Sequence, residues 1–579
     1  MLTLKAFCNR SRNKWRTSRL ECSAQPLKLR EACLGNHNFI RYQSSSPVAV
    51  SSKVPSSETT SPREYFGQPL PFTHPHLLKS DETTIGITAR EYADRRKKLM
   101  DKLEDGSVVI LAGGRLQWMA HHVFYPFRQS SDFWYLTGFQ EPDSCLVLEK
   151  GNSEKGYEMT LFVRPKDLSK ELWEGARTGV EGVVRWFAAD KAFDIDQLAT
   201  KLRPLLTQST NIPIYLDLPD DAESLMRIRK SGSSLMNFFS PSASQDADLI
   251  SLLSSPFRNS RNQNDIEACL NVLATAPMRQ IRSRSKKSSK YRPIESLKRK
   301  LVPLKMIKSP AELKLLRKAC DITARGHKAA MRLAAQTSEH KSQTEYDLVR
   351  AFETTCQGDP VGFGGRMGYV PVCAAGDAAL TVHYTANDRM LQAGNQMVLL
   401  DAGFEYAGYL ADITRSFPSG NDGKFTSPQR DLYEAVLSVQ KDLISRCTEE
   451  ESVSLSSLHR ASCQLLRSAL SQLGFDLKVP GTLEQLYPHY IGHPVGTDLH
   501  DTPTLDRTTQ LKSGSVITIE PGIYVPHDDC FPSEFHGIGI RIEDMVQIKK
   551  KDYIVLSCNT PKEVIDVEAC GSGLLENLN

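Results

Sequence analysis

The chain has 579 residues, of which 40% are hydrophobic and 24% charged, and a formal net charge of +4. This length predicts two domains with extensions rather than one core. The near balance of charge argues against a nucleic-acid or membrane partner, and no apolar run approaches the roughly 20 residues of a membrane-spanning helix. The 13 cysteines are scattered without a C-x-x-C pair, which favours a reducing compartment over a disulfide framework.

The first 60 residues have the composition of a targeting segment. Residues 1–20 carry six lysines and arginines and no acidic residue, and serines accumulate in "YQSSSPVAVSSKVPSS". A basic, serine-rich and acid-poor segment is typical of a mitochondrial transit peptide, whereas a secretory signal needs a continuous apolar run. We therefore expect a mitochondrial presequence and disordered segment over residues 1–60, cleaved near residues 41–45. A plain disordered basic tail is the alternative.

Residues 85–255 predict an α/β domain. The stretches "SVVILAGG", "SCLVLEKG", "EMTLFVRP" and "IPIYLDL" have the pattern of buried strands. Helical stretches such as "DIDQLATKLRPLL" separate them. Alternating strands and helices indicate helices layered on a sheet.

A basic stretch separates this domain from the next one. Residues 256–300 include "RQIRSRSKKSSKYRPIESLKRK", which is dense in lysine, arginine and serine. Such a run is a candidate nuclear-localisation or nucleic-acid patch, but it is more often a solvated linker or insertion. We therefore expect a linker here, no nucleic-acid partner, and at most a minor nuclear pool.

A second domain is expected from residue 301 to residue 565. Its first long helix begins in "KSPAELKLLRKACDITARGHKAA". Ser309 suits the N-cap, Pro310 suits the first turn, and the Glu312 side chain can bond back to the cap. This pattern predicts a helix that begins directly after Ser309.

Two aspartates, Asp401 and Asp412, lie in the largely apolar segment "LLDAGFEYAGYLADITRSF". Buried carboxylates are costly to ionise unless something positive meets them. Gly403 and Gly408 lie between two strand-like stretches here, so we expect a hairpin that brings the two carboxylates together. Taken alone, such a pair is more often a pair of turn residues.

Three histidines and two glutamates follow along the chain. His489, His493 and His500 lie in "YPHYIGHPVGTDLHDTP", which glycine and proline interrupt. Such a cluster in an intracellular protein indicates proton handling or metal ligation. Glu520 directly precedes a Pro-Gly pair, and Glu543 lies in "GIGIRIEDMVQI". Strand alternation places Glu543 on the face opposite three isoleucines, which is also the pattern of an ordinary solvent face.

Together, the order of two aspartates, a histidine, Glu-Pro-Gly and a final glutamate resembles the pita-bread metallopeptidases. That family includes methionine aminopeptidase, prolidase, creatinase and aminopeptidase P. The resemblance covers nearly all of the second domain and implies an α+β pita-bread (creatinase/aminopeptidase) catalytic domain. It further implies that two divalent metal ions are held by Asp401, Asp412, His493, Glu520 and Glu543. In the family, the second aspartate and the last glutamate bridge the two ions.

The implied ligand set suggests both the ion and the chemistry. Four carboxylates and one imidazole suit a hard divalent ion, and we expect Mn²⁺. Such a centre activates water and polarises the scissile carbonyl. By the same resemblance, Glu520 transfers the proton from water to the leaving amine, and His383 and His500 contact the scissile peptide and the oxyanion. His489 and Arg541 complete the expected substrate side, the arginine by supporting the bridging glutamate.

The first domain narrows the resemblance. The stretch "YPFRQSSDFWYLTGFQEPDS" resembles the N-terminal domain of aminopeptidase P, whose creatinase-like layer caps the catalytic cleft. Methionine aminopeptidases lack such a domain, and prolidases differ in this stretch. "LWEGARTG" matches the segment where that family has a substrate-facing arginine, here Arg177, although a surface arginine is the alternative. We therefore expect an α/β N-terminal creatinase-like domain.

An aminopeptidase-P-type enzyme with a presequence resembles the family's mitochondrial branch, the intermediate cleaving peptidases and mitochondrial Xaa-Pro aminopeptidases. Our main hypothesis is a metallo-aminopeptidase, in the matrix or on the matrix side of the inner membrane. It would remove one residue from the N-termini of imported proteins after presequence removal. Strict Xaa-Pro cleavage is the first alternative; prolidase-like dipeptide hydrolysis and a non-catalytic binding module are the others. Relatives are commonly dimers or tetramers, so a homo-oligomer is expected.

Overall fold

The computed structural model describes residues 65–208, 210–217, 292–358, 365–392, 394 and 396–574. The expected presequence with its cleavage position, and most of the expected basic linker, lie outside the described residues. Among the residues described, no helix is both long enough and apolar enough to cross a membrane.

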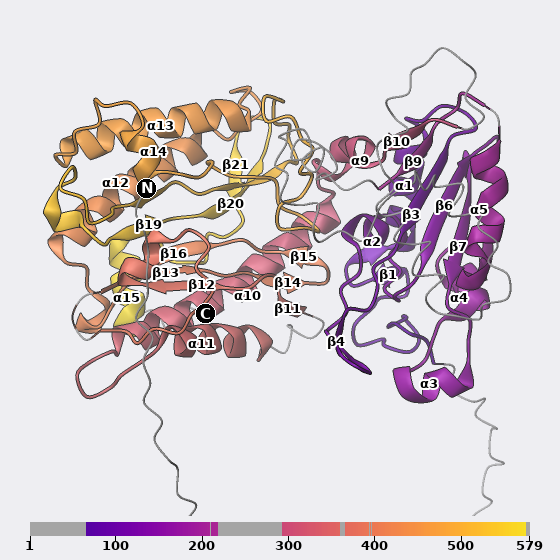
Figure 1. The fold of residues 1–579 in the computed structure, drawn as a ribbon, viewed down its shortest axis with the longest axis horizontal. Coiled ribbons are helices and arrows are strands. Elements are labelled where there is room, and N and C mark those ends of the chain that lie inside the picture. The colour runs from indigo at the N-terminus through magenta and orange to yellow at the C-terminus, as the bar shows by residue number, and fades with distance from the viewer. Residues whose placement is uncertain are drawn as a thin grey trace, which may run out of the picture. The chain divides into compact units, whose positions relative to one another are not determined.

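A six-stranded sheet organises the N-terminal domain, in the order β10-β9-β3-β6-β7-β8 (Figure 1). The pairs β3–β6 and β6–β7 are antiparallel, whereas the pairs β7–β8, β3–β9 and β9–β10 are parallel. The strands are Val108–Ala112 (β3), Cys145–Lys150 (β6), Tyr157–Val163 (β7), Lys191–Asp194 (β8), Ile214–Leu216 (β9) and Ile294–Ser296 (β10). The edge strand β10 lies within residues 256–300, so the final part of that basic stretch pairs with the sheet.

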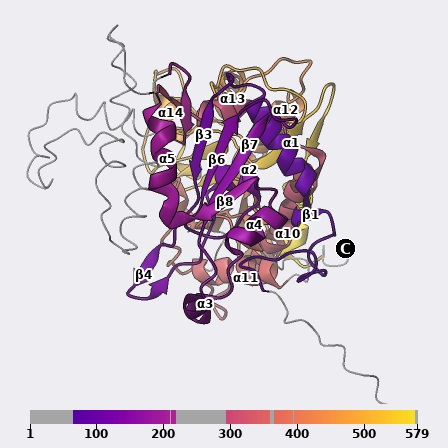
Figure 2. The same cartoon turned by 90° about the vertical axis from the view of Figure 1, so that its right-hand side faces the viewer.

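Helices cover both faces of this sheet, because successive side chains of a strand point to opposite sides. Val108 and Ile110 of β3 pack with α5, whereas Val109 and Leu111 pack with α1 and α2. Figure 2 shows α5 running along the strands. The helices are Ala89–Met100 (α1), Ser131–Thr137 (α2), Leu168–Glu174 (α3), Gly179–Trp186 (α4) and Leu198–Thr207 (α5). A sheet with helices on both faces confirms the expected α/β class.

Two short hairpins accompany the sheet. They are formed by Glu82–Thr84 (β1) with Ile87–Thr88 (β2), and by Trp118–Ala120 (β4) with Val123–Phe124 (β5). The β4–β5 hairpin and α3 carry a set of exposed apolar side chains: Trp118, Met119, Val123, Phe124, Leu168, Leu172 and Trp173.

Long helices enclose the strands of the second domain. Figure 1 shows α10 and α11 on one side of these strands and α12 and α13 on the other. The Ser309 hydroxyl accepts from the Glu312 N–H while the Glu312 carboxylate accepts from the Ser309 N–H, so the predicted helix start is confirmed. The helices are Lys298–Lys305 (α9), Pro310–Ala335 (α10), Glu345–Gln357 (α11), Ser427–Ser445 (α12), Leu455–Gln472 (α13), Thr482–Leu486 (α14) and Val564–Gly571 (α15).

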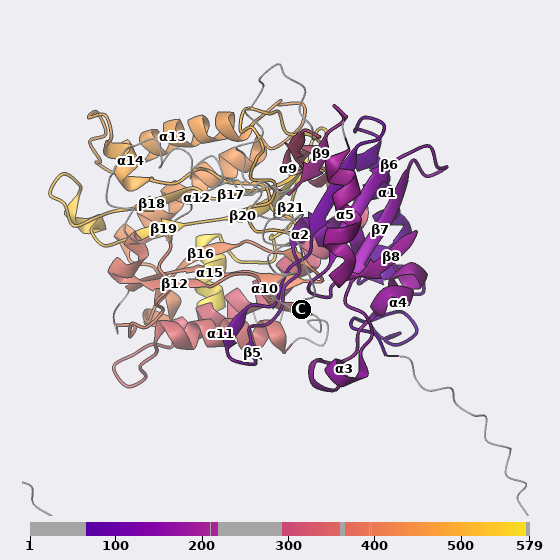
Figure 3. The ribbon, with the colours of Figure 1, turned by 45° about the vertical axis from the view of Figure 1, so that its right-hand side comes forward.

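Antiparallel strands lie between these helices (Figure 3). They form the sheets β12-β13-β16, β17-β20-β21, β11-β14-β15 and β18-β19. The strands are Gly365–Met367 (β11), Val372–Ala375 (β12), Gln396–Asp401 (β13), Phe404–Tyr406 (β14), Tyr409–Leu410 (β15), Thr414–Ser419 (β16), Val516–Ile519 (β17), Gly522–Tyr524 (β18), Gly539–Arg541 (β19), Asp544–Ile548 (β20) and Tyr553–Val555 (β21). Helices packed on antiparallel sheets confirm the expected α+β class of this domain.

Candidate metal centre

Strands β13 and β16 deliver the two aspartates. Asp401 ends β13 and is paired with Thr414 at the start of β16. The residues between them form the small hairpin β14–β15, after which Asp412 lies two residues before the start of β16. The Tyr369 hydroxyl lies 2.6 Å from Oδ1 of Asp401 and 2.9 Å from Oδ1 of Asp412. The predicted hairpin, and the predicted closeness of its two carboxylates, are confirmed.

Glu520 and Glu543 lie at a break shared by two paired strands. On one side of the break β17 pairs with β20, and on the other side β18 pairs with β19. Pro521 lies in the break, and its missing N–H removes a donor from the ladder. Side chains at such a break are released from the strict alternation of a continuous strand. Both glutamates therefore approach the same point from opposite strands.

His493 lies among these carboxylates. Its Nε2 is 3.4 Å from Oδ2 of Asp412 and 3.6 Å from Oε1 of Glu520, and its Nδ1 faces its neighbour's carbonyl oxygen at 3.2 Å. That backbone contact orients the ring so that Nε2 points at the acids. Burial lowers the pKa of His493, but Asp412 and Glu520 outweigh it and raise the pKa to about 9. Asp412, His493 and Glu543 offer ligand atoms within 4.8 Å of one another.

The negative charges of these converging carboxylates are only partly compensated by positive charges of the described residues. Burial, and then the neighbouring carboxylates, raise the pKa of Glu543. Burial also raises the pKa of Glu520 to about 7 and that of Asp401 above its usual range, although Arg541 opposes both shifts. Two like charges 4 Å apart repel by roughly 4 kcal/mol at an effective dielectric of about 20. Cations relieve this repulsion, so the oxygen-rich donor set with one imidazole fits divalent metal ions.

Arg541 is buried beside the centre and orients its acids. Its Nη2 lies 2.7 Å from Oδ2 of Asp401, and its Nη1 donates to the Tyr524 hydroxyl at 2.7 Å. Its Nε donates to the Thr414 hydroxyl at 3.1 Å, and that hydroxyl donates to Glu543 at 2.6 Å. Arg541 thus supports Asp401 directly, and the support that the resemblance implied for Glu543 runs through Thr414.

Two of the remaining histidines lie around the same point. The ring centroids of His500 and His493 are 4.2 Å apart, and Nε2 of His489 lies 2.9 Å from the Tyr524 hydroxyl. Burial lowers the pKa of His489 to about 3 and also lowers that of His500. A charge on His383, which is itself exposed, adds a small repulsion to both shifts. His489, His493 and His500 therefore lie at one site, and the place of His383 beside them stays a prediction.

Arg177 lies between α3 and α4 of the N-terminal domain. Its Nη2 is 2.7 Å from Oε2 of Glu174, and its Nη1 donates to the Pro165 carbonyl oxygen at 3.3 Å. Only 6% of the residue is exposed, so the alternative of a surface arginine is wrong. None of its contacts recorded within the described ranges is with the residues of the centre, and its substrate role stays a prediction.

Sequence reasoning missed Tyr369 and two threonines that order the centre. The Thr518 hydroxyl accepts from the His493 N–H at 3.0 Å, and Thr414 bonds Glu543 as described. Each threonine lies two positions from an expected ligand, so strand alternation could have indicated both. Tyr369 has no comparable local signal, because its contacts depend on how distant segments pack.

Comparison with known proteins agrees with this geometry. The family model described as metallopeptidase family M24 matches residues 314–550, and the aminopeptidase P N-terminal domain matches residues 92–215. Intermediate cleaving peptidase 55 of Saccharomyces cerevisiae is 38% identical over 504 residues, which cover 87% of this chain and 88% of that protein. The chain belongs to metallopeptidase family M24. Human Xaa-Pro aminopeptidase 3 is 34% identical to this M24 chain over 531 residues, with coverages of 89% and 92%.

A solved structure extends the agreement to both domains of the M24 chain. The crystal structure of Icp55 from Saccharomyces cerevisiae matches it with a TM-score of 0.67 and 34% identity, covering 86% of this chain and 100% of that one. The expected fold, an aminopeptidase P N-terminal domain followed by a pita-bread catalytic domain, is confirmed. The M24 chain is a metallopeptidase, and its family implies divalent metal ions, which the donor set fits.

Gly492 lets the segment that carries His493 approach β17 closely in the M24 chain. A Cβ at this position would lie 2.0 Å from the Thr518 carbonyl oxygen. We expect Gly492→Ala to push the His493 backbone away, to lower the free energy of unfolding by about 1–3 kcal/mol, and to lower the metal content of the purified protein. Urea unfolding and metal analysis measure the two effects. Gly151→Ala is the control, since nothing lies within 4 Å of its Cβ; equal behaviour of the two variants would contradict the argument.

Proposed function

We propose that this chain is a dinuclear metallo-aminopeptidase that removes one residue from the N-termini of proteins imported into mitochondria, after presequence cleavage. The observation that carries the proposal is the convergence of buried carboxylates on His493, with His489 and His500 beside them. The similarity over most of the chain to a protein named intermediate cleaving peptidase 55 supports this choice among peptidases.

Five side chains would hold the ions: Asp401, Asp412, His493, Glu520 and Glu543. Once bound, two divalent ions supply the Lewis acidity that lowers the pKa of water and polarises the scissile carbonyl. We propose Mn²⁺, because oxygen donors with a single imidazole suit a hard ion.

The chain's own groups then handle the proton and the substrate. Glu520 accepts the proton of the attacking water and passes it to the leaving amine. His500, whose ring packs on that of His493, donates to the oxygen that becomes negative, and His383 holds the peptide from the solvent side. Arg541 acts by orienting Asp401. The substrate contacts expected of His489 and Arg177 stay predictions. His489 lies beside Tyr524 at the centre, whereas Arg177 contacts Glu174 in the N-terminal domain.

The proposed function is tested with two peptides and the manganese-loaded protein. One peptide begins Tyr-Ser-Ser and the other Ala-Pro-Ser, and mass spectrometry identifies the products. We expect loss of the N-terminal tyrosine from the first peptide. Loss of alanine from the second peptide alone would instead support a strict Xaa-Pro aminopeptidase, the second candidate, which the similarity to human Xaa-Pro aminopeptidase 3 favours. No hydrolysis of either peptide would contradict both candidates.

We propose the mitochondrial matrix as the place of action, on the basic and acid-poor composition of residues 1–60. None of the relatives described above has a name that points to the nucleus, so a nuclear pool is not proposed. The exposed apolar side chains of the β4–β5 hairpin and α3 support the expected homo-oligomer, since a second copy could cover them. Sedimentation velocity measures that assembly.

A further inference from the structure

Residues 494–501 form a loop that connects two histidines of the centre. The N–H of Asp501 donates to the carbonyl oxygen of the loop's first residue at 2.9 Å, and the rings of His493 and His500 lie 4.2 Å apart at its ends. Asp498 and Asp501 stand on either side of His500 in the sequence. Whatever anchors these two carboxylates therefore also anchors the backbone that carries the His500 imidazole.

Two lysines anchor one end of this loop. Nζ of Lys305 lies 2.7 Å from Oδ1 of Asp501, and Nζ of Lys308 lies 2.8 Å from Oδ2. Burial alone would raise the pKa of Asp501, but the two lysines lower it, so the carboxylate is charged at neutral pH. Lys305 also pairs with Asp132 of α2 at 2.7 Å. The contact of Lys305 with Asp501 is thus linked to the N-terminal domain through Asp132.

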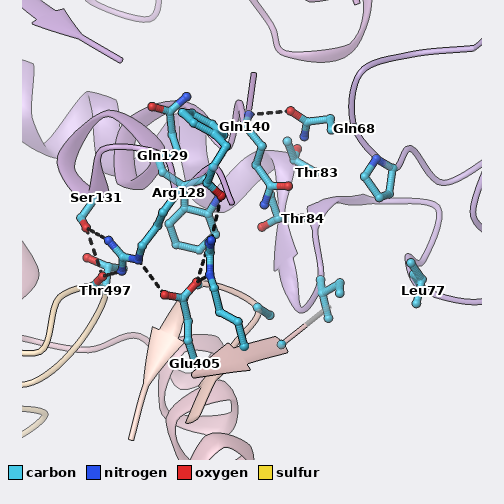
Figure 4. Close-up of a pocket in the computed structure, with 18 of the residues that line it drawn as sticks. Gln68, Leu77, Thr83, Thr84, Arg128, Gln129, Ser131, Gln140, Glu405 and Thr497 are labelled. Carbon is cyan, nitrogen blue, oxygen red and sulfur yellow. Dashed lines mark hydrogen bonds and ion pairs between the residues drawn. The ribbon is translucent and has the colours of Figure 1, made fainter. Parts of the chain in front are cut away.

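The N-terminal domain also anchors the loop directly, through Arg128. Its Nη2 donates to the Thr497 carbonyl oxygen at 2.6 Å, and its Nη1 lies 3.5 Å from Oδ1 of Asp498. The hydroxyl of Ser131, the first residue of α2, lies 2.5 Å from Oδ1 of Asp498 and 3.1 Å from the Thr497 carbonyl oxygen, and its one hydrogen is shared between them. Figure 4 shows Arg128 and Ser131 together at Thr497, with Glu405 on the other side of the guanidinium. The contact with Glu405, 2.7 Å from Nε, fixes the direction of the arginine side chain.

We propose that Arg128 is a positioning residue for His500, so that the N-terminal domain sets the geometry of the catalytic loop in addition to covering the cleft. The inference rests on the proposed function, in which His500 takes part in hydrolysis. Without the guanidinium, the loop keeps its anchor at Asp501, but Ser131 and the more distant Lys305 are then its remaining recorded partners at Thr497 and Asp498. The imidazole then occupies positions away from the reacting atoms, and a misplacement of about 1 Å can cost roughly 100-fold in rate.

The first test is Arg128→Gln. The partly buried Arg128 leaves behind the buried carboxylate of Glu405, which keeps Arg366 as its cationic partner at 3.0 Å. We expect kcat to fall by roughly 10- to 100-fold while KM changes by less than about threefold, because geometry rather than binding is lost. Ser131→Ala removes a second bond to the same two groups without touching Glu405, and kcat should fall in the same direction. Unchanged kcat in both variants would overturn the inference.

Arg366 supplies a matched control. Its Nε lies 3.0 Å from Oε1 of Glu405, and its Nη1 donates to the Phe127 carbonyl oxygen at 2.7 Å. It therefore connects the same two domains, yet none of its contacts recorded in the described part of the chain reaches Thr497 or Asp498. Arg366→Gln should change kcat by less than about threefold. Equal losses in Arg366→Gln and Arg128→Gln would overturn the inference, because they would indicate a general role of the domain junction.

A double-mutant cycle with His500→Ala decides the matter. A residue that acts through His500 has nothing to position once the imidazole is gone, so Arg128→Gln should cost less than about a further twofold in that background. Additive losses would overturn the inference, and so would a loss of bound metal that parallels the loss of activity. Failure of the wild-type protein to hydrolyse either peptide would instead refute the proposed function, which separates the two failures.

Discussion

Asp412→Ala should abolish metal binding and peptide hydrolysis together. Asp412 is 4% exposed, its Oδ2 faces His493 at 3.4 Å, and it belongs to the set whose ligand atoms lie within 4.8 Å of one another. Removing this carboxylate takes away one of the five proposed ligands, so we expect the centre to hold divalent ions poorly. Metal ions contribute several kcal/mol of charge stabilisation, so we expect kcat/KM to fall by roughly 1,000-fold or more.

Metal analysis and peptide hydrolysis measure the two losses in the same protein preparation. Asp105→Ala is the control, because its carboxylate is 86% exposed and lies at the surface of the N-terminal domain. That variant should keep both metal and activity. Full hydrolysis by Asp412→Ala, in protein whose metal content has been checked, would rule out the catalytic centre as assigned.

Arg415→Ala should lower the free energy of unfolding by about 3–5 kcal/mol, the usual cost of breaking a buried ion pair from one side. Arg415 and Asp544 are both fully buried, and Nη2 of the arginine lies 2.8 Å from Oδ1 of the aspartate. Despite burial, Arg415 and Lys562 hold the pKa of Asp544 well below its usual range. Alanine leaves that buried carboxylate with Lys562 as its remaining cationic partner, at 2.7 Å.

The same substitution should also weaken metal binding, because Arg415 donates to the backbone carbonyl of Glu543 at 2.5 Å. Urea unfolding with and without added Mn²⁺ separates the two effects. Arg430→Ala is the matched control: its pair with Glu568 at 2.6 Å is 44% exposed on the arginine side, and such pairs contribute about 0–1 kcal/mol. Equal destabilisation by the two substitutions would contradict the role given to burial.

Local sequence patterns were enough for several features of this protein. The capping box at Ser309 depends on residues three positions apart, and the approach of Asp401 to Asp412 depends on a hairpin within one segment. Both features follow from backbone geometry over a few residues, which strand and helix periods describe well. The class of the first domain followed from the same periods, whereas the class of the second domain and its metallopeptidase activity were implied by the resemblance that the order of acids and histidines carries.

The tertiary structure alone decided which distant groups complete the centre. Tyr369 reaches both aspartates, and Arg128 reaches a loop 370 residues away in the chain. The approach of Glu520 to Glu543 likewise depends on a break shared by two paired strands. Sequence periods describe which face of an element is buried but carry no information about which other element covers it. That choice is made by the packing of the whole chain, where shape and charge complementarity select one arrangement.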